Sequence, residues 1–308
     1  MKGQAGFSII ELLVATAILF VVSGAVLGLL HDGLAGTPIL EEAADLHQRA
    51  RVVSDALSTE LRASAAGPPS GALSRYFAAV EPRHPVDPVG SASPTAITLR
   101  YVPAGGAHAR LMQPLTPGVP VAILEAAGCP VNTTACGFVA QTTAVIFDGA
   151  GHADFVQIDA IGPGILTITD LGGGRSVSYA AGAEIAEALQ VTYFFDAPAR
   201  QLRRAEGSGT FVVVDNVIAV TFDYFADGMA PMSLPQFQDG PFVGAGATAF
   251  DADLLRVKAI RAALRLETGV DRMRGVDAAL FARPGTATGR RTIPDVVARV
   301  DIALRNGS

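Results

Sequence analysis

One segment near the start of the chain constrains the fold more than any other. Residues 7–30 read FSIIELLVATAILFVVSGAVLGLL, which is apolar apart from small residues, hydroxyls and one acid, Glu11. Helical residues rise about 1.5 Å each, so roughly 20 of them cross the roughly 30 Å hydrocarbon core of a bilayer. A buried helix of a soluble protein is the alternative. Because the segment follows a short leader that carries Lys2, the sequence predicts a membrane-spanning helix with a cytoplasmic N-terminus.

An ordinary secretory signal peptide also begins with a positive charge and an apolar stretch. Here the leader MKGQAG is short, the apolar run follows it directly, and no small-residue cleavage site ends the run. Glu11 adds a constraint, because a charged side chain inside a membrane-spanning helix costs at least about 2.5 kcal/mol on insertion scales. The sequence therefore predicts a partner for the Glu11 carboxylate.

The segment GFSIIELLVA resembles the cleavage and methylation motif of type IV prepilins and type II secretion pseudopilins, through Gly6, Phe7 and Glu11. The resemblance implies that prepilin peptidase cuts between Gly6 and Phe7, and that the new N-terminal Phe7 is N-methylated. Glu11 is then the fifth mature residue. In that family its carboxylate pairs with the N-terminal amine of a neighbouring subunit during assembly, which would supply the missing partner.

The region after the apolar segment predicts a second helical stretch. Gly33, Gly36 and Pro38 interrupt the first pattern, and residues 39–65 then resume with helical periodicity. A single apolar face of this kind usually packs against other elements, so we expect an amphipathic helix that covers a sheet. Between the two stretches we expect a kink or break. The apolar face consists of Leu46, Ala50, Val53, Leu57 and Leu61.

The rest of the chain predicts a β-rich head. Residues 67–95 are dense in Gly, Pro and Ser and predict a loop or irregular excursion. Apolar and polar residues then alternate, as in antiparallel strands with one buried face. We expect strands at 97–101, 143–147, 155–160, 165–169, 188–195, 217–225, 259–267 and 296–304. One long helix followed by strands predicts an α+β, pilin-like fold, with the helix packed on an antiparallel sheet.

These patterns divide the chain into four parts. They are a leader at residues 1–6, a transmembrane and filament-core helix at 7–30, an amphipathic extension at 31–66 and a periplasmic or extracellular head at 67–308. Within the head, the long turn-rich stretches 228–249 and 271–294 predict surface loops.

The two cysteines, Cys129 and Cys136, lie close together in GCPVNTTACGF, among turn-forming residues. A local disulfide is expected if the head is exported to an oxidising compartment. Two free thiols, or half of a metal site, are the alternatives. No second cysteine pair exists and no histidine lies near in sequence, so we expect the disulfide and no metal site here.

Composition and motifs argue against several kinds of chemistry. The formal net charge of −6 is unsuited to phosphate binding through the overall field, so no nucleic acid partner is expected. The five histidines are scattered, at positions 31, 47, 84, 108 and 152, and neither HExxH nor GxSxG occurs. The glycine-rich segment 170–178, DLGGGRSVS, lacks the lysine of a phosphate-binding loop and predicts a hairpin turn. We therefore expect no enzyme and no cofactor.

Two acidic pairs offer oxygen atoms that Ca²⁺ could bind. They are Asp148 with Asp154, and Asp251 with Asp253. Neither pair has the spacing of an EF-hand loop. We therefore expect solvated loop acids rather than a cation site.

Two further segments resemble a subfamily. Residues 48–67 resemble the helix end of PilW-type minor pilins, and residues 297–308 resemble their closing strand, while the type II secretion pseudopilin J family has a related layout. A bulky head would crowd a repeating filament, so the chain is read as a minor pilin. A minor pseudopilin and an adhesive or ligand-binding tip subunit remain alternatives.

The resemblance also implies partners and a location. The partners are prepilin peptidase, other major and minor pilins, the inner-membrane assembly platform and membrane lipid. The chain would span the inner membrane once, with its head in the periplasm, and would then move into a pilus or pseudopilus.

Overall fold

The computed structural model describes residues 8–64, 78–84, 87, 91–103, 105–150, 152–171, 175, 177–207, 209–226, 230–243, 250–287 and 292–304, with the backbone alone for residues 31–36. The chain forms two compact units. Unit 1 comprises Met1–Gln48 and Thr268–Asp295, and unit 2 comprises Arg49–Glu267 and Val296–Ser308.

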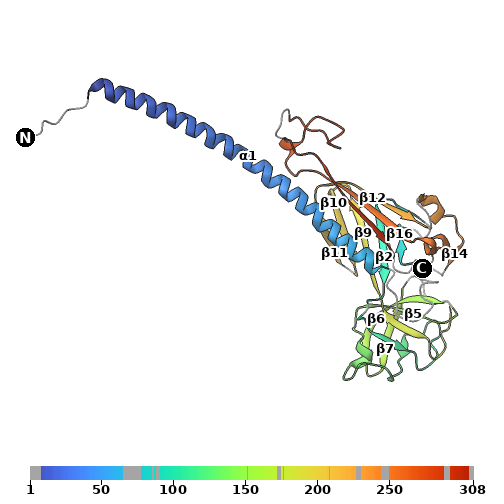
Figure 1. Ribbon diagram of the computed structural model, residues 1–308. Helices are drawn as coiled ribbons and strands as arrows, with labels where there is room; N and C mark the ends of the chain where they lie inside the picture. Colours follow the sequence, from blue (N-terminus) through green and yellow to red (C-terminus); the bar gives the residue numbers. More distant parts are fainter. Residues whose placement is uncertain are drawn as a thin grey trace, which may run out of the picture. The chain divides into compact units, whose positions relative to one another are not determined.

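A single helix, α1, runs over Ile9–Ala63 and contributes to both units (Figure 1). The break that the sequence suggested near Gly33 and Gly36 does not occur, and Pro38 lies inside the helix. Proline removes one backbone donor, and Gly36 and Thr37 before it are weak helix formers, but the run LEEAADL that follows at 40–46 consists mostly of strong helix formers and favours continued helix. The predicted apolar face is confirmed, since its five members are all buried.

A five-stranded antiparallel sheet forms the centre of unit 2. Its order is β1 (Val80–Glu81), β2 (Ala96–Tyr101), β9 (Leu189–Asp196), β10 (Gln201–Glu206) and β11 (Gly209–Val214). The C-terminal part of α1 is tied to this sheet by Glu60, which accepts hydrogen bonds from Tyr101 at 3.0 Å and Arg204 at 2.8 Å. The predicted packing of a helix on an antiparallel sheet is therefore confirmed.

A second antiparallel sheet in unit 2 has four strands. They lie in the order β13 (Pro231–Met232), β12 (Val217–Phe225), β16 (Ala259–Leu266) and β17 (Val296–Ala303). β16 alternates buried and half-buried residues along its whole length, as its sequence predicts. The expected strand at 217–225 matches β12 at both ends.

Six further strands of unit 2 close into a small barrel. Their order is β3 (His108–Arg110), β8 (Glu184–Glu187), β5 (Thr143–Phe147), β6 (Ala153–Gly162), β7 (Ile165–Asp170) and β4 (Val121–Ile123). The first and last strands meet just beyond β3 and β4, where Met112 N–H donates to Ile123 O and Glu125 N–H donates to Arg110 O, both at 2.8 Å. Residues from all six strands fill the interior, among them Ala109, Ala122, Ile146, Ile158, Ile168 and Ile185.

The barrel is inserted into the five-stranded sheet. Its strands lie between β2 and β9 in sequence, yet β2 and β9 pair directly with each other. The sequence predicts strands here but not a separate closed domain. The expected hairpin turn at 170–178 is wrong, because β7 pairs with β6 and β4 and not with β8. Residues 172–174 and 176 lie outside the described part.

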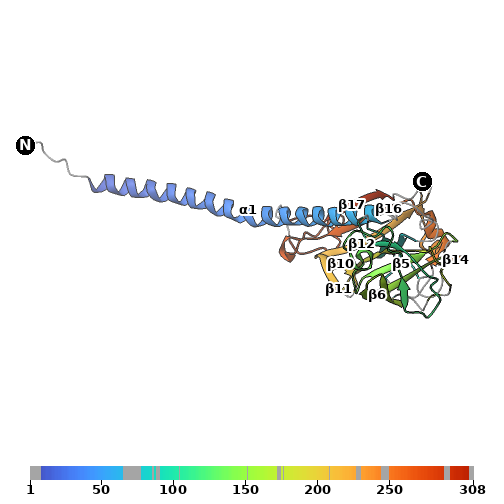
Figure 2. The same cartoon turned by 90° about the horizontal axis from the view of Figure 1, so that it is seen from below.

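The predicted loops contain short regular elements. Described residues of 228–249 form β13, the 3₁₀ helix η2 (Leu234–Phe237) and β14 (Phe242–Val243), which pairs with β15 (Phe250–Asp251). The second segment of unit 1, Thr268–Asp295, is called the insertion below and contains the 3₁₀ helix η5 (Asp271–Met273). Of the predicted excursion 67–95, residues 67–77 lie outside the described part, and Val80–Glu81 form a strand. Figure 2 shows the same elements from a second direction.

Candidate functional site

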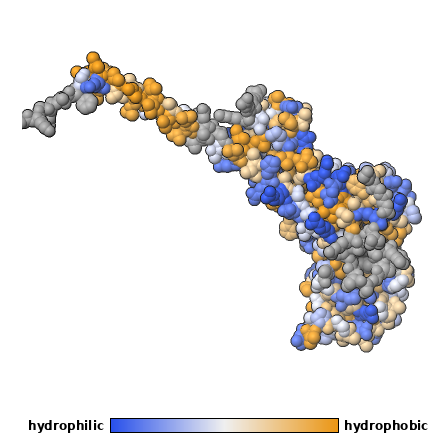
Figure 3. Space-filling model, in the orientation of Figure 1, coloured by the Kyte–Doolittle hydropathy of each residue, from blue (hydrophilic) through white to orange (hydrophobic). Residues whose placement is uncertain are grey.

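The N-terminal part of α1 presents apolar side chains on all sides. Ile9–Leu30 is a candidate membrane span of 22 residues with mean hydropathy 2.6, and none of it is buried. Ile10, Phe20 and Val21 are 71%, 76% and 73% exposed. Figure 3 shows this stretch in the colour of hydrophobic residues. A helix that is apolar all round requires apolar surroundings, which a bilayer or a bundle of similar helices supplies.

Glu11 lies at the start of this helix and takes part in its N-terminal cap. The Ser8 N–H donates to Glu11 Oε2 at 3.1 Å, and the Ile10 N–H donates to Ser8 Oγ at 3.2 Å. Together they form a capping arrangement of the S-x-x-E kind. The sequence SIIE carries this signal, although the expectations from the sequence did not include a cap.

The cap occupies only part of the Glu11 carboxylate. Its second oxygen, Oε1, has no hydrogen-bond partner among the residues that the structure describes. The expected processing residues Gly6 and Phe7 lie outside those residues. The structure therefore places Glu11 at the exposed end of the apolar helix and leaves the cleavage site undescribed.

Glu42 joins α1 to the insertion of unit 1. Its Oε1 accepts hydrogen bonds from Thr268 Oγ1 at 2.8 Å and from the Gly269 N–H at 2.7 Å. Further along, the insertion buries Met273, Phe281 and Ile293, each at most 6% exposed. The predicted surface loop is therefore a packed segment whose beginning is fixed to α1 by one carboxylate.

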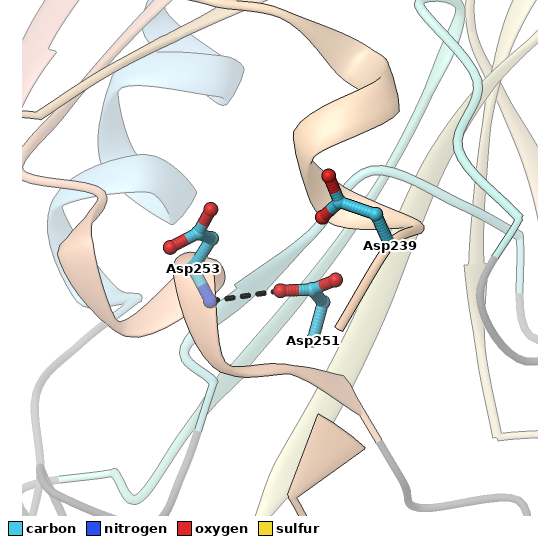
Figure 4. Close-up of side chains that lie close together, drawn as sticks. All are labelled: Asp239, Asp251 and Asp253. Atoms are coloured by element: carbon cyan, nitrogen blue, oxygen red, sulfur yellow. Dashed lines mark hydrogen bonds between the residues drawn. The ribbon is translucent and has the colours of Figure 1, made fainter. Parts of the chain in front are cut away.

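Three carboxylates meet beside β15. Ligand atoms of Asp239, Asp251 and Asp253 all lie within 4.8 Å of one another (Figure 4). Asp251 is 1% exposed, so the expectation of a solvated acid is wrong for this residue. The third member, Asp239, comes from the segment before β14 and was not singled out by sequence spacing.

Donors of the chain itself already bind these acids. Asp251 accepts from the Gly240 N–H at 2.7 Å through Oδ2 and from the Asp253 N–H at 2.9 Å through Oδ1. Arg256 pairs with Asp253 at 3.0 Å. Backbone donors that bind a buried carboxylate stabilise its charge. The geometry thus accounts for Asp251 as the residue that holds the β14–β15 connection together.

The other acidic pair of the sequence analysis does not form one site, since its two members bind different partners in the barrel. Asp148 accepts from the backbone and ring of His152. Burial opposes ionisation of Asp148, but these hydrogen bonds hold its pKa below the usual value. Asp154 accepts from Tyr179 Oη at 2.8 Å, and burial raises the pKa of Asp154 despite that bond. Asp154 is 9% exposed, so it too is not a solvated acid.

Cys129 and Cys136 form a disulfide on the barrel. The bridge closes a loop that ends in the 3₁₀ helix η1 (Thr134–Gly137). Between the cysteines, Val131 is 89% exposed. The bridge therefore constrains a loop that presents an apolar side chain to its surroundings.

The described histidines of the head bind separate local partners. His84 packs edge-on against Phe194, His108 lies 3.2 Å from Glu184, and His152 lies 2.9 Å from Asp148. The three rings thus have three different partners, and these contacts do not gather them into one site.

Comparison with protein families gives a match to the prokaryotic N-terminal methylation motif over residues 1–27. That range contains Gly6, Phe7 and Glu11, together with most of the exposed apolar helix. No curated protein and no solved structure matches the chain.

Proposed function

We propose, because the chain carries a prepilin-type N-terminal methylation motif, that it is a pilin-like subunit anchored in the membrane and then built into a filament. The observation that carries this proposal is the coincidence of the motif with a helix of 22 residues of which none is buried. Prepilin peptidase would cut between Gly6 and Phe7, and Phe7 would be N-methylated. The same apolar surface would face lipid first and neighbouring pilin helices later.

Glu11 links these two states in the proposal. After cleavage the Phe7 amine is a cation at the same helix end as Glu11. In a dry helix bundle an unpaired carboxylate is costly, whereas a carboxylate paired with a cation and hydrogen-bonded is tolerated. Glu11 would therefore accept the amine of a neighbouring subunit, and this pairing would set the axial register of the two helices.

Glu11→Gln tests the pairing, in cells that hold the matching assembly machinery. Glutamine keeps an acceptor for the Ser8 N–H but carries no charge. We expect normal membrane insertion and at least a tenfold loss of the chain from sheared filaments. Ser8→Ala is the matched control, because it removes the cap hydroxyl and keeps the charge, and it should assemble. Incorporation of Glu11→Gln at the wild-type level would exclude the pairing.

A minor position in the filament follows from the size of the head. Besides the helix and the five-stranded sheet, the head carries a closed barrel inserted between β2 and β9. Such added volume is easier to place at one position than at every repeat. Counting subunits in purified filaments by quantitative mass spectrometry should give at least tenfold fewer copies than the main pilin. Equal numbers would contradict the proposal.

Partners separate the proposed pilus role from its main alternative. A PilW-type minor pilin would be recovered with other pilins and the pilus assembly platform, whereas a J-like minor pseudopilin would be recovered with secretion components. Both proteins would use the same membrane helix. Cross-linking at Phe20 inside isolated filaments and identification of the linked chain distinguish the two.

The inserted barrel favours a second candidate role, ligand binding at the filament tip. Its disulfide-closed loop holds the exposed Val131. Val131→Asp should reduce the adherence of piliated cells without changing pilus number, because it replaces the exposed apolar side chain of this loop by a charged one. Unchanged adherence would leave the barrel without this role.

A further inference from the structure

β11 is an exposed edge strand whose sequence carries no charge. It is the last strand of the five-stranded sheet and pairs on one side with β10. Its residues read GTFVVV. Phe211 is 59% exposed and Val212 is 49% exposed, although neighbouring residues of a strand point to opposite faces. Both faces of this edge are therefore apolar and open to the surroundings.

The other sheet edges in the described part of unit 2 are protected. β1, β13, β14 and β15 have two residues each, and β13 contains Pro231. β17 is long but exposes Arg299 and Asp301 along its outer residues. The barrel closes on itself and leaves no long edge. Short strands, proline, charge and bulges are the usual devices that keep an edge from pairing with another chain. β11 has six residues without proline or charge, and its one bulge, at Val213, lies beyond Thr210 and Val212.

The register of the β10–β11 hairpin identifies the backbone groups at this edge. Glu206 pairs with Gly209 across two intervening residues, and Arg204 pairs with Phe211. In such a hairpin the residues that flank the loop exchange both hydrogen bonds, and every second pair does the same. The N–H and C=O groups of Thr210 and Val212 therefore point away from β10. They are donors and acceptors for a further strand.

Charge around β11 indicates what kind of strand would bind. Glu206, at the end of β10, and Glu60 both pair with Arg204, so this group of three keeps one net negative charge beside the start of β11. Asp215, just after the strand, lies 3.6 Å from Arg49, and its side chain is 58% exposed. A second copy of β11 has no basic residue to place against these acids, whereas a strand of another chain with basic ends would complement them.

We infer that β11 is a docking edge for an extended segment of a different subunit, with β-branched residues at its centre and Lys or Arg at its ends. The segment adds a sixth strand to the sheet through Thr210 and Val212. This inference rests on the proposed pilin-like function for the identity of the partner as a sister subunit. It concerns the head and is independent of the Glu11 pairing.

The test is binding of a fluorescent peptide, Lys-Thr-Val-Thr-Val-Thr-Lys, to the full-length protein in detergent micelles. We expect saturable binding by fluorescence anisotropy. Val212→Pro should weaken it at least tenfold, because proline removes an outward N–H and leaves the ladder to β10 intact. Val212→Ile keeps that N–H and should bind within twofold of wild type.

Changes in the peptide give the same test without altering the protein. Proline at its central Thr should abolish binding, and Glu in place of both Lys residues should weaken it at least tenfold. Equal binding of the proline peptide, or of Val212→Pro, would overturn the inference. A dimer of the chain that Val212→Pro dissolves would overturn the choice of partner. Failure of peptide binding leaves processing at Phe7 and assembly through Glu11 unaffected, so the two proposals fail separately.

Discussion

Arg204 of β10 donates a hydrogen bond to Glu60 of α1 at 2.8 Å, and their side chains are 23% and 15% exposed. Glu60 also accepts from Tyr101, and burial followed by the charge of Glu60 raises the pKa of Tyr101. One carboxylate thus joins the helix to two strands of the five-stranded sheet. This half-buried contact orients the C-terminal part of α1 on that sheet.

Glu60→Gln should lower the free energy of unfolding of unit 2 by about 1–3 kcal/mol, because a charge-assisted bond to a half-buried arginine is lost. Urea unfolding of the full chain in micelles measures the change. Asp301→Asn is the matched control. It breaks the more exposed pair with Arg261, which has side chains 40% and 55% exposed, and should cost less than about 1 kcal/mol. Equal effects of the two changes would contradict the role of Glu60.

Asp154 should make the barrel sensitive to pH. Burial raises its folded pKa, Asp170 adds to the rise, and Tyr179, Arg175 and His152 oppose it. A group whose folded pKa is raised contributes stability below its unfolded pKa and loses it as pH rises through the folded value. Asp154→Asn keeps an acceptor for Tyr179 and removes the charge.

The variant should therefore unfold at a higher temperature than wild type near neutral pH, and the difference should shrink on acidification toward about pH 4. Circular dichroism melts at several pH values measure it. Asp159→Asn, which alters a half-buried acid bound by Thr169, serves as the control. If the difference in melting temperature grows on acidification, the folded-state pKa of Asp154 is not raised and the prediction is wrong.

The disulfide should contribute to the stability of the barrel. For a closed loop of this length, with Cys129 and Cys136 separated by 7 positions, the chain-entropy estimate is about 2–3 kcal/mol. Replacing both cysteines by serine should lower the urea midpoint accordingly. A reductant should lower the midpoint of wild type and leave the serine variant unchanged. If the serine variant unfolds at the wild-type midpoint, the bridge has no such role.

Much of the helix and the long strands could be predicted from local pattern. The alternation in β16, with Ile260, Ala262, Leu264 and Leu266 on the buried face, is confirmed residue by residue. β10 was not predicted because Arg203 and Arg204 are adjacent and disguise its alternation. β11 was missed because its uninterrupted apolar run has no period of two.

The barrel could not be predicted from local pattern, for a different reason. Its closure depends on the backbone hydrogen bond between Glu125 N–H and Arg110 O, and on strands whose partners are far away in sequence. Local periodicity identifies a strand but does not specify its neighbour. The acidic cluster could not be predicted for the same reason, because Asp239 is far from Asp251 in sequence and only the folded chain brings the two carboxylates together.

The central claim, that the chain is a processed pilin-like subunit, is tested most directly by the intact mass of the full-length protein isolated from membranes with and without prepilin peptidase. With the peptidase, the mass should fall by residues 1–6 and rise by one methyl group, and fragmentation should place that methyl on the Phe7 amine. Without it, the leader should remain. Retention of residues 1–6 in the presence of an active peptidase, with a known prepilin cleaved in the same cells, would contradict the claim.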